Sequence, residues 1–240
     1  MRTVLITGAS SGIGAASARL FLEAGWAVGL LARRREALEA VAGGHPHAHV
    51  LVADVAEPGQ VAGAVAMLRA RTGRVDVLFN NAGVFVPTGE IDEMSLEDWE
   101  HALRVNLTGM VLAARAVWPV MRAQGHGRIV NNGSISAHVP REGAVAYTVT
   151  KHGVTGLTRQ LALDGREHGI ACGQIDIGNA RTPLLEGLDA ASRAVGGAGV
   201  PMMDVGDAAR SVLHMATMPP EANVLFLTVM ANAMPYVGRG

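Results

Sequence analysis

The chain has 240 residues, enough for one large domain or two small ones. Hydrophobic residues make up 49% and charged residues 17% of it, which provides a sizeable core and excludes a disordered chain. The formal net charge of −1 argues against a nonspecific attraction to nucleic acid or to anionic membranes, and no apolar run approaches the roughly 18 residues that span a bilayer.

The chain contains one cysteine, Cys172, so it forms no intrachain disulfide, which is typical of a reducing compartment. Cys172 lies in the strand-like run GIACGQIDI, which favours a buried, unreactive thiol over a nucleophile. The N-terminal run MRTVLITGAS does not resemble a signal peptide, because its apolar part is short and leads straight into a glycine loop. We therefore expect a cytoplasmic protein.

Strand-like and helical segments alternate along the whole chain. Apolar and β-branched runs predict strands at 2–7, 27–32, 49–55, 75–80, 127–132, 170–176 and 223–229. Helical spacing predicts helices at 12–25, 34–42, 57–71, 95–123, 144–167 and 205–217. Pro119 is expected to bend the long helix. Continuous apolar strands joined by helices are typical of a parallel sheet covered on both faces, so we predict a single α/β domain over residues 1–240, a Rossmann-type doubly wound sheet of about seven strands.

The segment 183–204 breaks this alternation, since it is long, rich in glycine and weakly periodic. Such segments in compact domains are usually binding loops, and we predict a substrate-binding loop or lid here. Its apolar and largely uncharged character favours a neutral or hydrophobic substrate, but no motif in it identifies one.

The run TGASSGIG at 7–14 follows the first predicted strand and opens the first predicted helix, the context of a dinucleotide-binding loop. The spacing is T-G-x-x-x-G-x-G rather than G-x-G-x-x-G. Glycines here permit a tight turn, close approach of a pyrophosphate and close packing of the helix, whose N-terminus favours phosphate. The predicted cofactor-binding residues of this loop are Gly8, Ser10, Ser11, Gly12, Ile13 and Gly14.

The end of the second strand indicates which dinucleotide binds. NAD-binding folds commonly place an acidic residue there, on the ribose 2′-hydroxyl. This chain has Ala32 at that point, followed by Arg33, Arg34 and Arg35. Guanidinium groups bind a 2′-phosphate that a carboxylate would repel, so we favour NADP(H) over NAD(H), with Arg33 as the main contact and Arg34 next.

Six motifs in the order TGASSGIG, ADV, NNAG, VNLTG, GSISA and YTVTK resemble those of the short-chain dehydrogenase/reductase family along nearly the full chain. The last motif contains Tyr147 and Lys151, which lie four residues apart and therefore on one face of a helix. Ser134 precedes Tyr147 by thirteen residues, as in the family, whereas Ser136 precedes it by eleven.

The resemblance implies a role for each matching position. The catalytic set would be Asn106, Ser134, Tyr147 and Lys151. Asp54 and Val55 would hold the adenine ring. The cofactor cleft would be completed by Asn81, Ala82, Gly83, Gly178 and Thr182, the last at the nicotinamide amide. Tyr147 and Lys151 would also contact the cofactor, Lys151 through the nicotinamide ribose. One departure is Ile177 before Gly178, where the family usually has proline; isoleucine restores a backbone donor.

The chemistry explains why a phenol and an ammonium share a helix face. Reducing a carbonyl leaves an alkoxide that needs a proton, and an unperturbed tyrosine, with a pKa of about 10, supplies one poorly at neutral pH. A neighbouring cation favours the phenolate and makes such a phenol a usable acid and base. By resemblance, Ser134 would donate to the substrate oxygen and Asn106 would hold a water in a proton path from Lys151.

Other features are less specific. The run HPHAH at 45–49 reads as a surface turn, so we expect no metal. His138 and Arg141 lie between Ser134 and Tyr147, near the expected pocket, and His138 either contacts the substrate or is a loop residue. The tail 230–240 either closes the pocket or reaches a second subunit. In the family the helices near 95–123 and 144–167 form subunit contacts, so the resemblance implies a homodimer or homotetramer.

The favoured hypothesis is an NADP(H)-dependent oxidoreductase that interconverts a small-molecule carbonyl and a secondary alcohol, with Tyr147 as general acid and base. The alternatives are an NAD(H)-dependent alcohol dehydrogenase of the same fold and a non-catalytic dinucleotide-binding sensor or scaffold. The physiological direction is not readable from the sequence.

Overall fold

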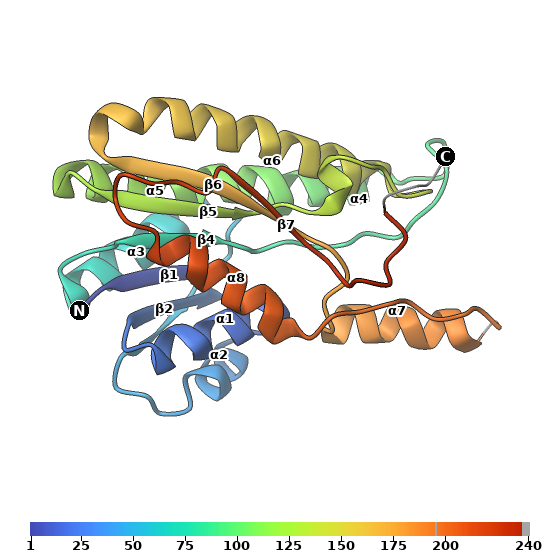
Figure 1. The fold of residues 1–240 in the computed structure, drawn as a ribbon, viewed down its shortest axis with the longest axis horizontal. Helices are drawn as coiled ribbons and strands as arrows, with labels where there is room; N and C mark the ends of the chain where they lie inside the picture. The colour runs from blue at the N-terminus through green and yellow to red at the C-terminus, as the bar shows by residue number, and fades with distance from the viewer. Residues whose placement is uncertain (195, 237–240) are drawn as a thin grey trace.

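The fold, taken from a computed structural model that describes residues 1–194 and 196–236, is built on one sheet of seven parallel strands in the order β3-β2-β1-β4-β5-β6-β7 (Figure 1). The strands are β1 (Thr3–Thr7), β2 (Ala27–Ala32), β3 (Ala48–Val52), β4 (Val77–Asn80), β5 (Gly127–Asn132), β6 (Ile170–Ile177) and β7 (Phe226–Val229). The order reverses between β1 and β4, which creates the switch point where ligands of doubly wound sheets bind.

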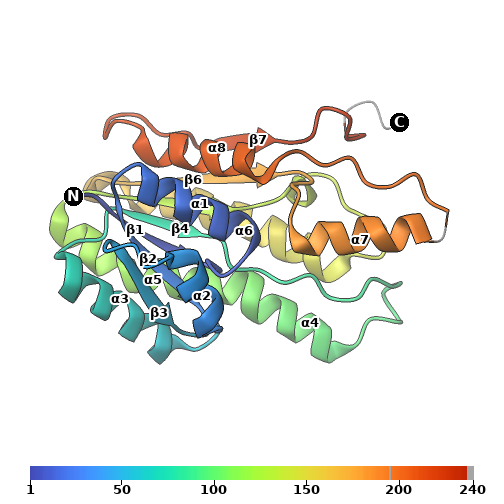
Figure 2. The ribbon, with the colours of Figure 1, turned by 90° about the horizontal axis from the view of Figure 1, so that it is seen from below.

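Helices cover both faces of this sheet (Figure 2). They are α1 (Gly12–Glu23), α2 (Arg35–Ala42), α3 (Pro58–Thr72), α4 (Leu96–Leu103), α5 (Gly109–Gln124), α6 (Val145–Asp164), α7 (Pro183–Ala194) and α8 (Val205–Thr217). Within β1, Val4 and Ile6 face the cluster with α1, α2 and α8, whereas Leu5 faces the cluster with α3 and α5. This alternation follows from the two-residue period of a strand, and it divides the core into two layers.

The predicted fold class is therefore confirmed, and all seven predicted strands begin and end within three residues of the observed strands. The largest shift at a strand start is at β7, where pairing begins only at Phe226. Ile177 pairs with Val229, so β6 continues through the position where the resemblance implied proline.

The predicted long helix at 95–123 is in fact interrupted. A π-helical segment, Arg104–Thr108, separates α4 from α5, whereas α5 runs on past Pro119 to Gln124. Such π-bulges are frequent at functional sites because they shift the side chains that follow by a fraction of a turn. Asn106 lies at the centre of this segment.

The expectation of a loop over 183–204 was wrong for its first half, where Pro183–Ala194 form α7. Figures 1 and 2 show α7 extending beyond the carboxyl ends of the strands, on the side where α4 also projects. The apolar residues of α7 do recur with a helical period, but the glycines of the surrounding segment concealed it in the sequence. The role of this segment as a lid stays a prediction.

Two further observations bear on expectations from composition. No helix among the described residues is long and apolar enough to cross a membrane. Cys172 lies in the middle of β6 with its side chain fully buried, and desolvation raises the pKa of its thiol to about 12. This confirms the reading of Cys172 as an inert core residue, because the reactive form of a cysteine is the thiolate.

Candidate active site

A cavity of about 450 Å³ opens at the carboxyl ends of the central strands. Its lining comes from the β1–α1 loop, the ends of β2, β3, β4 and β5, the connection after β6 and the first turns of α6. Parallel strands bring all these segments to one edge of the sheet, which is where the fold places ligands.

The glycine loop forms one wall of the cavity. Gly8 and Gly12 adopt positive φ angles of 66° and 53°, and a Cβ on Gly8 would lie 2.9 Å from the Cα of Ala82. Ser11 is the N-cap of α1 without a side-chain capping bond, and the first turn of α1 holds no acidic residue. Its first backbone N–H groups are therefore available to an anion.

Gly14, unlike the other loop residues predicted to bind the cofactor, does not line the cavity. A Cβ at this position would lie 2.3 Å from the carbonyl oxygen of Gly8. Gly14 therefore lets α1 pack against the loop, the role that its place in the glycine motif predicted, and it contributes no direct surface to the cavity.

The three arginines after β2 separate into two groups. Arg33 and Arg34 line the cavity, whereas Arg35 is absent from its lining and pairs with Glu39 at 3.6 Å across one helical turn. Among the described residues, neither Arg33 nor Arg34 lies within 4.0 Å of a carboxylate oxygen. Two guanidinium groups are therefore free to bind an anion at this end of the cavity.

Residues from β3 and β4 complete the same half of the cavity. Asp54 folds into a turn in which its Oδ1 accepts a hydrogen bond from Ala56 N–H at 2.9 Å, and Val55 lies beside it. Asn81 ties three strands together: its backbone N–H donates to Thr7 Oγ1 at 2.8 Å and its Oδ1 accepts from Asn132 Nδ2 at 2.9 Å. Ala82 and Gly83 follow Asn81 along the lining.

Tyr147 and Lys151 lie on consecutive turns of α6 and both line the other half of the cavity. The ammonium of Lys151 is buried, donates to the carbonyl oxygen of Asn132 at 2.8 Å, and lies 5.5 Å from the centroid of the Tyr147 ring. Phe85 packs against the same ring, with the two centroids 4.9 Å apart. The phenol and the ammonium are thus held in a fixed relation at the cavity wall.

Ser134 faces the same half of the cavity from the turn after β5. Its backbone N–H donates to Asp176 Oδ1 at 3.0 Å, and its Oγ accepts from the N–H of Ser136 at 3.1 Å. Asp176 is fully buried and also accepts a bond from Gln174 Nε2 at 2.7 Å. This buried carboxylate therefore fixes the position of the turn that presents Ser134.

Sequence reasoning missed Gln174 and Asp176. The available signal was their spacing of two residues in an otherwise apolar strand, which places both on one face. His138 also belongs to this cluster: its Nε2 lies 2.7 Å from Asp176 Oδ2, and His138 is absent from the cavity lining.

Asn106 does not reach the cavity. Its Oδ1 accepts from the backbone N–H of Val84 at 2.7 Å, and its Nδ2 donates to the carbonyl oxygen of Val84 at 2.9 Å. The amide thus holds the chain that follows β4, where Val84 lines the cavity. A role of Asn106 in a proton path from Lys151 stays a prediction.

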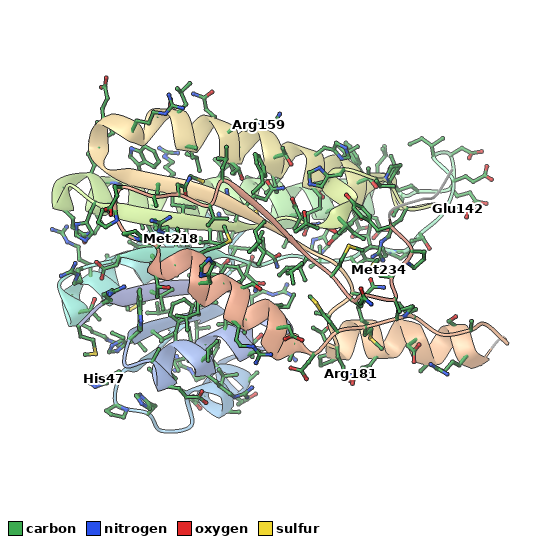
Figure 3. All side chains as sticks on the ribbon, in the orientation of Figure 1. His47, Glu142, Arg159, Arg181, Met218 and Met234 are labelled. Carbon is green, nitrogen blue, oxygen red and sulfur yellow. The ribbon has the colours of Figure 1, made fainter. Side chains whose placement is uncertain are left out.

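The connection after β6 forms the remaining wall. Gly178 and Thr182 line it as predicted, and a Cβ on Gly12 would lie 3.2 Å from Thr182 Cγ2. The tail also approaches, since a Cβ on Gly178 would meet Met234 Sδ at 3.1 Å; Met234 is labelled in Figure 3. Residues 237–240 of the tail lie outside the described part of the chain.

These features fit a nicotinamide dinucleotide. One half of the cavity offers glycines at which a Cβ would clash, free helix N–H groups and two arginines that have no carboxylate partner among the described residues. The other half offers a hydroxyl, a phenol and an ammonium. The fold and the site are therefore those of a dinucleotide-binding oxidoreductase.

Comparison with known proteins identifies the family. The family model described as short chain dehydrogenase matches residues 2–193. The chain is 38% identical over 192 residues to 2-(R)-hydroxypropyl-CoM dehydrogenase of Xanthobacter autotrophicus, covering 77% of each chain. It is 36% identical over 198 residues to D-beta-hydroxybutyrate dehydrogenase of Rhizobium meliloti, covering 77% of this chain and 74% of the other.

Solved structures agree. The 3-ketoacyl-(acyl-carrier-protein) reductase of Brucella melitensis, complexed with NADH, matches with a TM-score of 0.87 and 27% identity over 95% of this chain and 96% of that one. An actinorhodin polyketide ketoreductase with NADPH matches with a TM-score of 0.88, 28% identity and 96% coverage of both. The chain belongs to the short-chain dehydrogenase/reductase family, and it is an NAD(P)-dependent enzyme that acts on CH–OH or C=O groups.

Proposed function

We propose that the protein is an NADP(H)-dependent carbonyl reductase or alcohol dehydrogenase in which Tyr147 is the general acid and base. The observation that carries this proposal is the convergence of Ser134, Tyr147 and Lys151 on the cavity that the glycine loop also lines. When bound, the nicotinamide dinucleotide supplies or accepts the hydride, and the protein supplies binding, orientation and the proton.

In the reducing direction, the Tyr147 hydroxyl donates its proton to the carbonyl oxygen as that oxygen becomes an alkoxide. The buried ammonium of Lys151, fixed by the Asn132 carbonyl, stabilises the phenolate that remains. The Ser134 hydroxyl donates a hydrogen bond to the same substrate oxygen, where negative charge accumulates. Asn106 contributes by holding Val84 at the cavity wall rather than by touching the reacting atoms.

The preference for NADP(H) is supported by Arg33 and Arg34, which line the cavity without a carboxylate partner in the described part of the chain. A 2′-phosphate at this end would receive charge-assisted hydrogen bonds from both side chains. The structures of relatives hold NADH in one case and NADPH in another, so the two arginines carry the argument.

The substrate is not indicated by the relatives alone. Their names include acidic substrates, such as D-beta-hydroxybutyrate, and neutral ones, such as D-threitol and levodione.

We also expect a cytoplasmic homodimer or homotetramer. The exposed apolar residues Val111 on α5 and Val149 and Leu163 on α6 support a subunit contact on these helices, and light scattering of the purified protein tests it.

The test of this function is hydride transfer to a panel of ketones and aldehydes, followed by the absorbance of NADPH at 340 nm. Tyr147→Phe is expected to reduce kcat by about 10²–10⁴-fold while the affinity for NADPH is kept. Arg33→Ala is expected to weaken NADPH binding by about 10-fold and leave NADH binding unchanged. A Tyr147→Phe enzyme with wild-type rates would refute the role of Tyr147, and a folded protein that binds NADPH but reduces nothing would favour a sensor.

A further inference from the structure

The catalytic half of the cavity contains a second cation besides Lys151. Arg141, in the segment between Ser134 and Tyr147, lines the same cavity as those two residues. Its Nη2 donates to the Oδ1 of Asn179 at 2.8 Å, and Asn179 is itself buried directly after Gly178. One hydrogen bond thus holds the guanidinium across the cavity, between the segment before α6 and the segment after β6.

The guanidinium of Arg141 is not neutralised by the protein. Among the described residues, no carboxylate oxygen lies within 4.0 Å of it. The only acidic residue in the lining is Asp54, which belongs to the adenine half near Arg33 and Arg34. A guanidinium presents five N–H donors, and the hydrogen bond to Asn179 uses one of them.

Lys151, the other cation in this half of the cavity, already has a partner within the protein and a role in the proposed proton transfer. Its ammonium is buried and donates to the carbonyl of Asn132 beside the Tyr147 ring. Arg141 therefore supplies a positive charge that the proposed proton transfer does not use. A neutral amide partner positions a guanidinium without cancelling its charge, which is the arrangement expected for a residue that binds an anion.

We propose that Arg141 recognises an anionic group on the substrate, so that the enzyme acts on oxo acids and hydroxy acids rather than on neutral ketones and alcohols. This inference rests on the proposed function, because it assigns the substrate class of the same site. It also revises the expectation of a neutral substrate drawn from the apolar segment 183–204, which contributes Pro183 and Leu185 to the lining and thus an apolar surface for the carbon chain.

The test uses pairs that differ in charge and by one methyl group: 3-oxobutanoate, 4-oxopentanoate and 5-oxohexanoate, each against its methyl ester. The series varies the distance between the carbonyl and the carboxylate, which the structure does not specify. For at least one chain length, the wild type is expected to show a kcat/KM about 10–100-fold higher for the acid than for the ester, the size of a charge-assisted hydrogen bond.

Arg141→Met is expected to bring the ratio of acid to ester close to one, mainly through a higher KM for the acid. Arg141→Lys retains part of the preference, because it keeps the charge but loses the fork of donors. Arg166→Met is the matched control: Arg166 is exposed at the far end of α6, outside the cavity lining, and its loss changes the net charge equally while the ratio stays at the wild-type value.

If Arg141→Met is poorly folded, the wild type alone decides: butanoate should inhibit reduction of the methyl esters competitively, and butanamide should not. The inference is refuted if the wild type prefers every ester, if the ratio survives in folded Arg141→Met, or if butanoate and butanamide inhibit alike. If the wild type reduces neither acids, esters nor any ketone of the panel, the proposed function fails as well, so the two failures are distinguished.

Discussion

Polar side chains are concentrated at both ends of the sheet, but the two ends use them differently. At the amino ends of the strands, the carboxylate of Asp76 accepts bonds from Thr3 N–H, Arg74 and His126, so the protein satisfies its own groups. At the carboxyl ends, Tyr147 and Arg141 face a cavity. Figure 3 labels one residue from each end of the sheet. Met218, whose carbonyl oxygen accepts a hydrogen bond from Arg128, lies at the amino end, and Arg181 lies at the carboxyl end.

This contrast separates polar groups that stabilise the fold, at the amino ends of the strands, from polar groups that face the cavity, at the carboxyl ends. A polar network that closes on itself stabilises the folded state. A polar group that faces a cavity contributes little to stability and is available to a ligand. Mutations at the amino end should therefore change stability at constant activity, and mutations at the carboxyl end should do the reverse.

The largest expected effect is at the carboxyl end. Lys151→Met removes the ammonium beside the Tyr147 ring, and kcat is expected to fall by about 10²–10⁴-fold because the phenol loses the cation that activates it. The methionine fills a similar volume, so the free energy of unfolding is expected to fall by less than about 1 kcal/mol. Steady-state kinetics and urea denaturation measure the two quantities. If the free energy of unfolding falls by clearly more than this amount together with kcat, Lys151 serves the fold as well as the reaction, and the prediction is contradicted.

The next effect is at the amino end. Asp76→Asn removes the charge that Arg74 and His126 share, and the free energy of unfolding at pH 7 is expected to fall by about 2–4 kcal/mol. Turnover per folded molecule is expected to stay at the wild-type value, because the cavity lies at the opposite edge. Urea denaturation and kcat are measured on the same sample. A fall in kcat together with the fall in stability would contradict the assignment of Asp76 to stability alone.

The pH dependence sharpens this prediction. Burial alone would raise the pKa of Asp76, but its hydrogen bonds from Arg74, His126 and the backbone N–H of Thr3 outweigh burial and lower that pKa from its ordinary value. A carboxyl group whose pKa is lower in the folded state contributes stability above its unfolded pKa of about 3.9, and this contribution is lost as the pH falls through the folded pKa. The stability difference between wild type and Asp76→Asn should therefore shrink between pH 5 and pH 3. A constant difference over that range would assign it to packing instead.

The smallest effects come from two amide side chains that make the same contact at opposite ends. Gln124 bonds the N–H and the C=O of Val75, each at 3.0 Å, and Asn106 bonds the N–H and C=O of Val84. Replacement by alanine is expected to cost about 1–2 kcal/mol of stability at either site. Only Asn106→Ala should also lower kcat, by about 10-fold, because Val84 lines the cavity. Equal kinetics for the two variants would show that the Asn106 contact serves stability alone.

Much of this arrangement was predictable from the sequence, because it depends on local patterns. Alternating apolar runs gave the seven strands, and the glycine loop with Tyr147 and Lys151 placed the site at the carboxyl edge. Except for Gly14 and Asn106, the residues predicted for catalysis and cofactor binding line one cavity.

The remaining features depend on contacts between distant parts of the chain. The bond between Asn106 and Val84 spans 22 residues, and the bonds of Asp176 to Ser134 and His138 span 42 and 38. The apolar periodicity of a short segment carries no information about contacts between residues so far apart in the sequence. The π-helical segment RVNLT contains no glycine or proline that would mark a break, so the sequence reads as one long helix there.

The single buried thiol gives this protein an internal reporter. Cys172 sits in β6 between the two polar ends, and its raised pKa of about 12 makes it unreactive while the sheet is intact. A thiol reagent can then modify Cys172 only after the central sheet opens, so the rate of labelling measures how often the native protein opens. Each variant described above can thus be ranked by conformational stability in native buffer, without denaturant and without an engineered labelling site.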